Sequence, residues 1–115
     1  KGEIALWLMI ETEQAVNNCL EIARTPGVGG LFLGPSDLAF SLGVPLGDPA
    51  VEAAIEKVVA AAQEADVPLG TLCGAGEVEK RLAQGFQFLA VGGDTGPSAS
   101  VKEAVATGRK FKMNP

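Results

Sequence analysis

The sequence predicts an α/β fold in which short parallel strands alternate with helices. Apolar runs recur four times, and each is followed by glycines, a proline or an acid that marks the end of a strand. The segments between the runs have lengths that suit crossovers between parallel neighbours. An open flavodoxin-like sheet normally has about five strands, whereas a closed eight-stranded barrel takes about 250 residues. These two architectures compete, and four βα units in 115 residues would make half of a (β/α)8 TIM barrel.

The first unit joins a long apolar strand to a capped helix. Residues 4–10 are seven apolar residues in a row, which is typical of a strand buried on both faces of a parallel sheet. Glu11 ends this strand. Thr12 is the expected N-cap of a helix over residues 13–24, which Pro26 and Gly27 bring to an end.

The second unit carries the most informative turn of the chain. Residues 30–33 form a short apolar strand that breaks at Gly34 and Pro35. Ser36 is expected to be the N-cap of the helix that follows, with Asp37 in its first turn and a short helical segment over residues 38–42 that runs into Gly43. Backbone amides and a carboxylate would then meet at one strand end, where an anion and a metal ion can both be held.

The third and fourth units repeat this scheme. Residues 49–66 have the clearest helical periodicity of the chain, with Asp48 as N-cap and Pro49 at the first helical position. A strand over residues 68–73 and a helix over 77–84 follow, and Gly85 stops that helix. The last unit has a strand over residues 86–91 and a helix over 98–107 that Gly108 closes. We therefore expect one domain over residues 1–108 and a polar tail over 109–115.

Composition excludes several classes of function. The net charge is −5, and without basic clusters or rows of aromatic residues neither a nucleic-acid partner nor an anionic membrane surface is expected. No apolar run approaches the roughly 20 residues of a membrane span, so we expect a cytoplasmic protein. Cys19 and Cys73 lack metal-ligand spacing and are expected to be buried thiols. The chain has no histidine, which removes Ser-His-Asp and Cys-His chemistry and histidine-ligated zinc.

Two acids occupy equivalent positions in the first two units. Glu11 and Asp37 are each the first acid after an apolar strand. Neighbouring parallel strands lie about 4.8 Å apart, so two carboxylates at adjacent strand ends can bracket one hard cation. The alternative is that both are ordinary helix-start residues, which acids favour because of the helix dipole. Asp94, after Gly92 and Gly93, is interpreted as a structural turn residue.

Several of these stretches together resemble the HpcH/HpaI aldolase family. The resemblance rests on Met9-Ile10-Glu11-Thr12, on Gly30-Leu31-Phe32-Leu33-Gly34-Pro35-Ser36-Asp37-Leu38, on Ser41-Leu42-Gly43 and on Phe88-Leu89-Ala90-Val91-Gly92-Gly93-Asp94-Thr95. It covers nearly the whole chain and fits only the second half of that family's barrel, its strands five to eight. It implies a class II aldolase that joins pyruvate or a related 2-oxo acid to an aldehyde, or cleaves the product.

The resemblance also implies roles for individual residues. Glu11 and Asp37 would bind a divalent ion, Mg²⁺ or Mn²⁺. The amides of Ser36 and Asp37, beside Gly34 and Pro35, would receive the carboxylate of the 2-oxo acid. Met9 stands where many members carry a glutamine that contacts substrate, and Gly29 stands where an aspartate is usual.

What the chain lacks leaves several interpretations open. The family's catalytic arginine and its histidine-aspartate base belong to the first half of the barrel, so no acid-base residue is expected in this half. The chain would be a fragment, a subunit completed by a complementary N-terminal half-barrel, or a homo-oligomer that covers its own sheet edges. A citrate lyase β-like or malyl-CoA lyase-type enzyme and a non-catalytic half-barrel module for binding or assembly are the alternatives.

Overall fold

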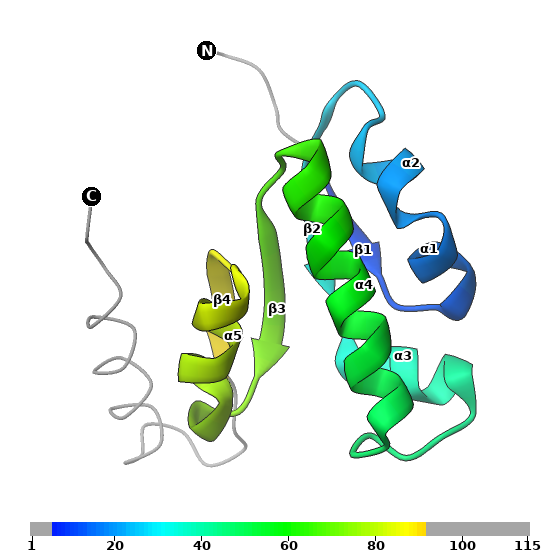
Figure 1. Cartoon of the computed structure of the whole chain (residues 1–115), viewed down its shortest axis with the longest axis vertical. Coiled ribbons are helices and arrows are strands. Elements are labelled where there is room, and N and C mark those ends of the chain that lie inside the picture. Colours follow the sequence, from blue (N-terminus) through cyan, green and yellow to red (C-terminus); the bar gives the residue numbers. More distant parts are fainter. Residues whose placement is uncertain (1–5, 92–115) are drawn as a thin grey trace.

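The computed structural model describes residues 6–91 and contains one four-stranded parallel sheet (Figure 1). The strands are β1 (Leu6–Ile10), β2 (Val28–Leu33), β3 (Leu69–Cys73) and β4 (Phe88–Val91). They pair in the order β1-β2-β3-β4. This order confirms the α/β prediction, and it differs from the 2-1-3-4-5 order of flavodoxin-like sheets. The predicted features of residues 92–115, including Asp94, the helix over 98–107 and the tail, lie outside the described residues.

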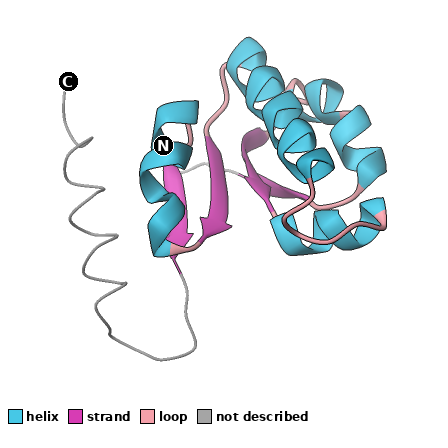
Figure 2. Cartoon of the chain, turned by 60° about the horizontal axis from the view of Figure 1, so that its bottom comes forward, coloured by secondary structure: helices cyan, strands magenta, loops and turns pink. Residues whose placement is uncertain are grey.

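The helices cover one face of the sheet (Figure 2). They are α1 (Glu13–Asn17), α2 (Cys19–Ala23), α3 (Pro35–Leu42), α4 (Pro49–Ala65), the 3₁₀ turn η1 (Ala75–Glu77) and α5 (Val78–Gln84). The helix expected over residues 13–24 is divided at Asn18, whose φ of −107° and ψ of 12° leave the helical region. Asparagine is a poor helix former because its side chain competes for backbone hydrogen bonds. Thr12 caps α1 as predicted, accepting the Ala15 N–H at 3.0 Å.

Helix α4 confirms the strongest periodicity of the sequence. The Asp48 carboxylate accepts the Ala50 N–H at 2.9 Å, and Pro49 occupies the first turn. The helix ends at Asp66, which has a left-handed φ of 60°. Its inner face buries five apolar side chains, namely Val51, Ile55, Val58, Ala61 and Ala62. These pack against side chains of β2 and α2 in the main core.

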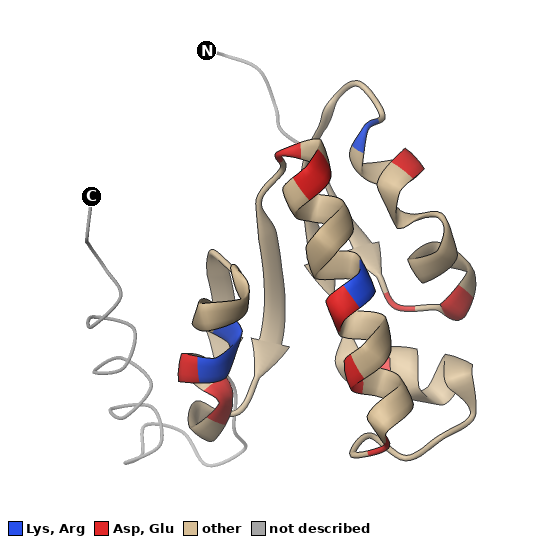
Figure 3. Cartoon of the chain, viewed as in Figure 1, with Lys and Arg blue, Asp and Glu red and all other residues tan. Residues whose placement is uncertain are grey.

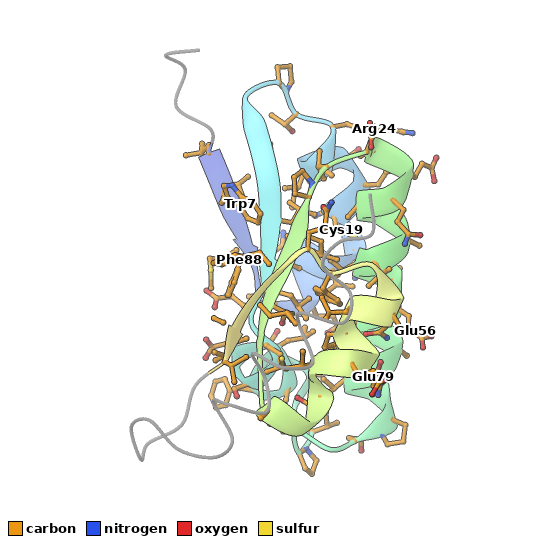
Figure 4. All side chains as sticks on the ribbon, turned by 90° about the vertical axis from the view of Figure 1, so that its left-hand side faces the viewer. Trp7, Cys19, Arg24, Glu56, Glu79 and Phe88 are labelled. Carbon is orange, nitrogen blue, oxygen red and sulfur yellow. The ribbon has the colours of Figure 1, made fainter. Side chains whose placement is uncertain are left out.

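The opposite face of the sheet carries apolar side chains that the described chain leaves exposed. Trp7 is 40% exposed, Met9 51% and Phe88 55%, whereas Ile10 and Leu33, which point toward the helices, are completely buried. Figure 4 shows Trp7 and Phe88 on the side away from the helices. The prediction that the first strand is buried on both faces is therefore wrong for this part of the chain. The reason is that no second layer covers that face within residues 6–91.

Aromatic rings lean over glycines on this open face. A Cβ at Gly30 would lie 2.7 Å from the Trp7 ring, and one at Gly70 would lie 2.9 Å from the Phe88 carbonyl oxygen. The Trp7 and Phe88 ring centroids are 6.1 Å apart although their strands are at opposite edges of the sheet. The rings therefore meet above the middle strands, in the space that the missing side chains leave.

Two further expectations concern the thiols and the membrane. Cys19 and Cys73 are both buried and free, as predicted. Among the residues with described structure, no helix combines the length and apolarity needed to cross a bilayer.

Candidate functional site

The candidate site lies where β1 and β2 end side by side. The register pairs Ile10 with Leu33, and the Gly34 N–H donates to the Ile10 carbonyl oxygen at 3.1 Å. The two strands therefore end level with each other, and Glu11 follows one while α3, with Asp37 in its first turn, follows the other. Glu11 and Asp37, which occupy equivalent positions in the sequence, therefore follow neighbouring strand ends in the structure.

The side chains of Glu11 and Asp37 interact. A hydrogen bond with the Asp37 carboxyl raises the pKa of Glu11 above its usual value, and desolvation and the like charge of Asp37 act in the same direction. The neighbouring Asp37 thus disfavours the charged form of Glu11, and a cation between the two side chains would offset this effect. The pair therefore favours the binding of a positive ion.

Gly34 makes room for this pair. A Cβ at position 34 would lie 3.3 Å from Glu11 Oε1 and 3.4 Å from Glu11 Cβ, and 3.8 Å from the terminal methyl of Met9. Glycine thus lets the Glu11 side chain pass close to the backbone of the neighbouring strand. Met9, Glu11 and Gly34 are therefore close together at the ends of β1 and β2.

The start of α3 differs from the prediction. Gly34, not Ser36, is the N-cap residue, and Pro35 and Ser36 already belong to the helix. Proline is well suited to the first helical position because its φ is preset and it has no N–H to leave unpaired. Helix geometry leaves the N–H groups of Ser36 and Asp37 in the first turn without an intrahelical acceptor. They remain available to an acceptor outside the helix.

A hydrogen bond that the sequence did not reveal joins α1 to α3. The Glu13 N–H donates to Ser41 Oγ at 2.9 Å. Ser41 lies one turn after Asp37, and this spacing, once the helix start is known, is the only signal that places both on one face of α3.

A cavity of about 630 Å³ adjoins the β2–α3 turn. Its lining includes Pro35, Ser36, Leu72 and Gly74, but neither Glu11 nor Asp37. Glu52 of α4 and Lys80 and Arg81 of α5 form another part of its wall. Figure 3 colours the acidic and basic positions along these two helices. The cavity therefore extends away from the acid pair, on the side where β3 ends.

Buried charge was the second feature that the sequence did not indicate. The Arg81 side chain is 6% exposed and lies 3.1 Å from a Glu52 carboxylate oxygen, with Gln84 as a further partner at 2.9 Å. Residues 52 and 81 are far apart in sequence, and neither has a local pattern that marks a buried pair. The pair joins α5 to α4 in the wall of the cavity.

The acid pair fits a divalent ion that keeps several waters. Within residues 6–91 no group of three histidine, cysteine, aspartate or glutamate side chains is arranged to hold a metal. Mg²⁺ is commonly bound by one or two carboxylates, with water and substrate as the other ligands. Glu11 and Asp37 match that requirement, and their oxygen atoms are the hard donors that Mg²⁺ and Mn²⁺ prefer.

Comparison with protein families gives one match that covers most of the chain. The model of the HpcH/HpaI aldolase/citrate lyase family matches residues 1–100. Among curated proteins, a 5-keto-4-deoxy-D-glucarate aldolase of Klebsiella pneumoniae is 38% identical over 107 residues, covering 90% of this chain and 41% of the relative. A hydroxypyruvate/pyruvate aldolase of Rhizorhabdus wittichii is also 38% identical over 107 residues, covering 88% of this chain and 43% of the relative.

Comparison with solved structures gives a similar protein of the same family. A HpcH/HpaI aldolase/citrate lyase family protein from Burkholderia cenocepacia superposes with a TM-score of 0.75 at 31% identity, over 93% of this chain and 42% of that one. The chain thus spans less than half the length of each of these three proteins.

Proposed function

Because the chain belongs to the HpcH/HpaI aldolase/citrate lyase family, we propose that it supplies the metal-binding half of a carbon–carbon lyase. The reaction would join pyruvate or a related 2-oxo acid to an aldehyde, or cleave the aldol product. The observation that carries this proposal is the contact of Glu11 with Asp37 at the level ends of β1 and β2. The names of the two 38% identical relatives, both aldolases, support the aldol reaction over the citrate lyase alternative.

The proposed metal ligands are Glu11 and Asp37, and the proposed ion is Mg²⁺ or Mn²⁺. When bound, such an ion supplies Lewis-acid stabilisation for the negative charge that develops on the keto oxygen of the substrate. Gly34 leaves the space in which the Glu11 carboxylate reaches that position.

The first turn of α3 is the proposed carboxylate site of the substrate. The Ser36 and Asp37 N–H groups are free of intrahelical partners and lie at the positive end of the α3 dipole. Pro35 holds the backbone of this turn, and Met9 borders it on the β1 side. These groups would orient the 2-oxo acid without taking part in proton transfer.

Proton transfer is proposed to depend on groups from elsewhere. The chain has no histidine, and the resemblance assigns the catalytic arginine and the histidine-aspartate base to the first half of the barrel. We therefore place no catalytic acid or base in this half.

The same reasoning extends to the architecture. We propose that residues 1–108 form half of a (β/α)8 barrel, followed by the tail over 109–115, and that the apolar sheet face with Trp7 and Phe88 is the barrel interior. The consecutive strand order, the single helix layer and the 42% coverage of the Burkholderia cenocepacia protein support this. A complementary N-terminal half-barrel or a second copy would cover the face.

Titration with Mn²⁺ tests the proposed metal site directly. Binding by the full chain is measured by isothermal titration calorimetry for the wild type, Glu11→Gln and Asp37→Asn, with Glu13→Gln as the matched control. Glu13 is an exposed acid two residues from Glu11, so the control loses the same charge. We expect both site variants to weaken binding and the control to retain it. Equal affinity in all four proteins would refute the metal site.

Activity is tested separately by exchange of the pyruvate methyl protons in deuterated water, with the first half of the barrel supplied as a second chain. Exchange that requires both chains, the metal and the Glu11 carboxylate is the expected result. Metal binding without any exchange would favour a binding or assembly module over an enzyme.

A further inference from the structure

We propose that Ser41 is a positioning residue that holds the Glu11 segment against α3 and so keeps Glu11 beside Asp37. The inference rests on the proposed metal site and names a residue that supports it without touching the metal. Its basis is the hydrogen bond in which the Glu13 N–H donates to Ser41 Oγ at 2.9 Å across 28 positions of sequence.

The geometry pairs two contacts along one face of α3. Asp37 and Ser41 are four residues apart, so their side chains lie one above the other on the helix. Glu11 and Glu13 flank Thr12 on the facing segment. Asp37 therefore meets Glu11 while Ser41 meets the Glu13 amide, and the two contacts act as parallel links between the same two segments.

The other bonds of the segment do not reach α3. The Gly34 N–H binds the Ile10 carbonyl before Glu11, which joins β1 to the end of β2. After Glu11, Thr12 accepts the Ala15 N–H through its side chain and the Val16 N–H through its carbonyl, both within α1. Among the hydrogen bonds of residues 6–91, the Ser41 bond is thus the one that ties the start of α1 to α3.

The Glu13 N–H has a physical reason to form this bond, and the Ser41 hydroxyl has no other structural role within residues 6–91. The Glu13 N–H lies in the first turn of α1, where no helix carbonyl accepts it. Ser41 is exposed, so its hydroxyl is not there to satisfy a buried group or fill a core position.

The test compares Ser41→Ala, which removes the acceptor, with Ser41→Thr, which retains a hydroxyl. Alanine favours helices, so Ser41→Ala leaves α3 able to form. Thr25→Val is the matched control, since Thr25 also makes one exposed bond to the backbone, 2.8 Å to the Glu21 carbonyl, in the loop before the amino end of β2.

Two readouts are measured on the full chain. Mn²⁺ affinity is followed by the loss of the free-ion signal in electron paramagnetic resonance, and hydrogen exchange at the Glu13 amide is followed by NMR without metal. We expect Ser41→Ala to bind Mn²⁺ about tenfold more weakly, the scale of outer-shell substitutions, and to exchange the Glu13 amide faster. Ser41→Thr should restore both values, and Thr25→Val should change neither.

The outcomes separate this inference from the proposed function. Wild-type affinity in Ser41→Ala, or a Glu13 amide that exchanges equally fast with and without the hydroxyl, would overturn the positioning role and leave the metal site standing. Failure of Ser41→Thr to recover affinity would also overturn it. A wild-type chain that binds no Mn²⁺ would overturn the metal site and, with it, the role of Ser41 in metal binding.

Discussion

Replacing Glu52 by alanine removes the nearest carboxylate partner of the Arg81 guanidinium in the cavity wall and leaves Glu77 at 3.9 Å. The Arg81 side chain is 6% exposed, and its ion pair with Glu52 measures 3.1 Å. Arg24 and Glu64 form an ion pair of the same length, 3.1 Å, but their side chains are 55% and 60% exposed. Both glutamates belong to α4, so Glu52→Ala and Glu64→Ala share the same change in helix propensity and differ in burial.

The expected loss follows from that difference. Removing one member of a fully buried pair costs about 3–5 kcal/mol, whereas exposed pairs contribute about 0–1 kcal/mol. Glu52 is itself 30% exposed, and the Glu77 carboxylate at 3.9 Å and Gln84 at 2.9 Å remain as partners for Arg81, so the value lies below the buried range. We expect a loss of about 2 kcal/mol for Glu52→Ala and less than about 0.5 kcal/mol for Glu64→Ala.

Urea unfolding followed by the fluorescence of Trp7, the one tryptophan of the chain, measures both values. With an m-value of about 1.5 kcal/mol/M, the midpoint of Glu52→Ala should fall by about 1.3 M. The midpoint of Glu64→Ala should stay close to that of the wild type. Equal midpoint shifts for Glu52→Ala and Glu64→Ala would refute this prediction, because the two ion pairs have the same length and differ in the burial of their arginine side chains.

Two other perturbations address the open sheet face and the acid pair. Gly30→Ala places a methyl group 2.7 Å from the Trp7 ring, so we expect a changed Trp7 emission maximum and a loss of about 1–3 kcal/mol in the free energy of unfolding. Gly47→Ala is the control, because nothing lies within 4 Å of a Cβ at that position. An unaltered Trp7 spectrum in Gly30→Ala would contradict the packing of the ring over Gly30. The pKa of Glu11 is raised by Asp37, so the folded state holds the Glu11 carboxyl proton more tightly than the unfolded state does. The stability that this proton contributes is present below pH 4.5 and is lost as the pH rises through the folded-state pKa of Glu11. Asp37→Asn should move the pKa of Glu11 down toward 4.5, measured by ¹³C NMR of the side-chain carboxyl; a pKa unchanged by this substitution would show that Asp37 is not its cause.

Local sequence signals predicted the individual elements well where the cause was itself local. Thr12 and Asp48 cap their helices, and Gly43 and Gly85 end theirs in left-handed conformations, with φ of 74° and 110°. Each of these outcomes depends on a side chain and backbone within a few residues. The prediction of Ser36 as the N-cap was wrong because Pro35 and Ser36 both carry helix-start signals. The preset φ of Pro35 suits the first helical position, which makes Gly34 the N-cap, two residues earlier than predicted.

The position of the acid pair was also predictable from the sequence alone. Glu11 and Asp37 each follow an apolar strand, and parallel strands present their carboxyl ends at one edge. Only the tertiary structure decided the Ser41 bond to the Glu13 amide and the Arg81–Glu52 pair, because they join residues 28 and 29 positions apart. Tertiary structure also decided that the apolar side chains of Trp7, Met9 and Phe88 face outward over residues 6–91. An apolar run specifies a strand, but burial on each face depends on which other layers are present to cover it.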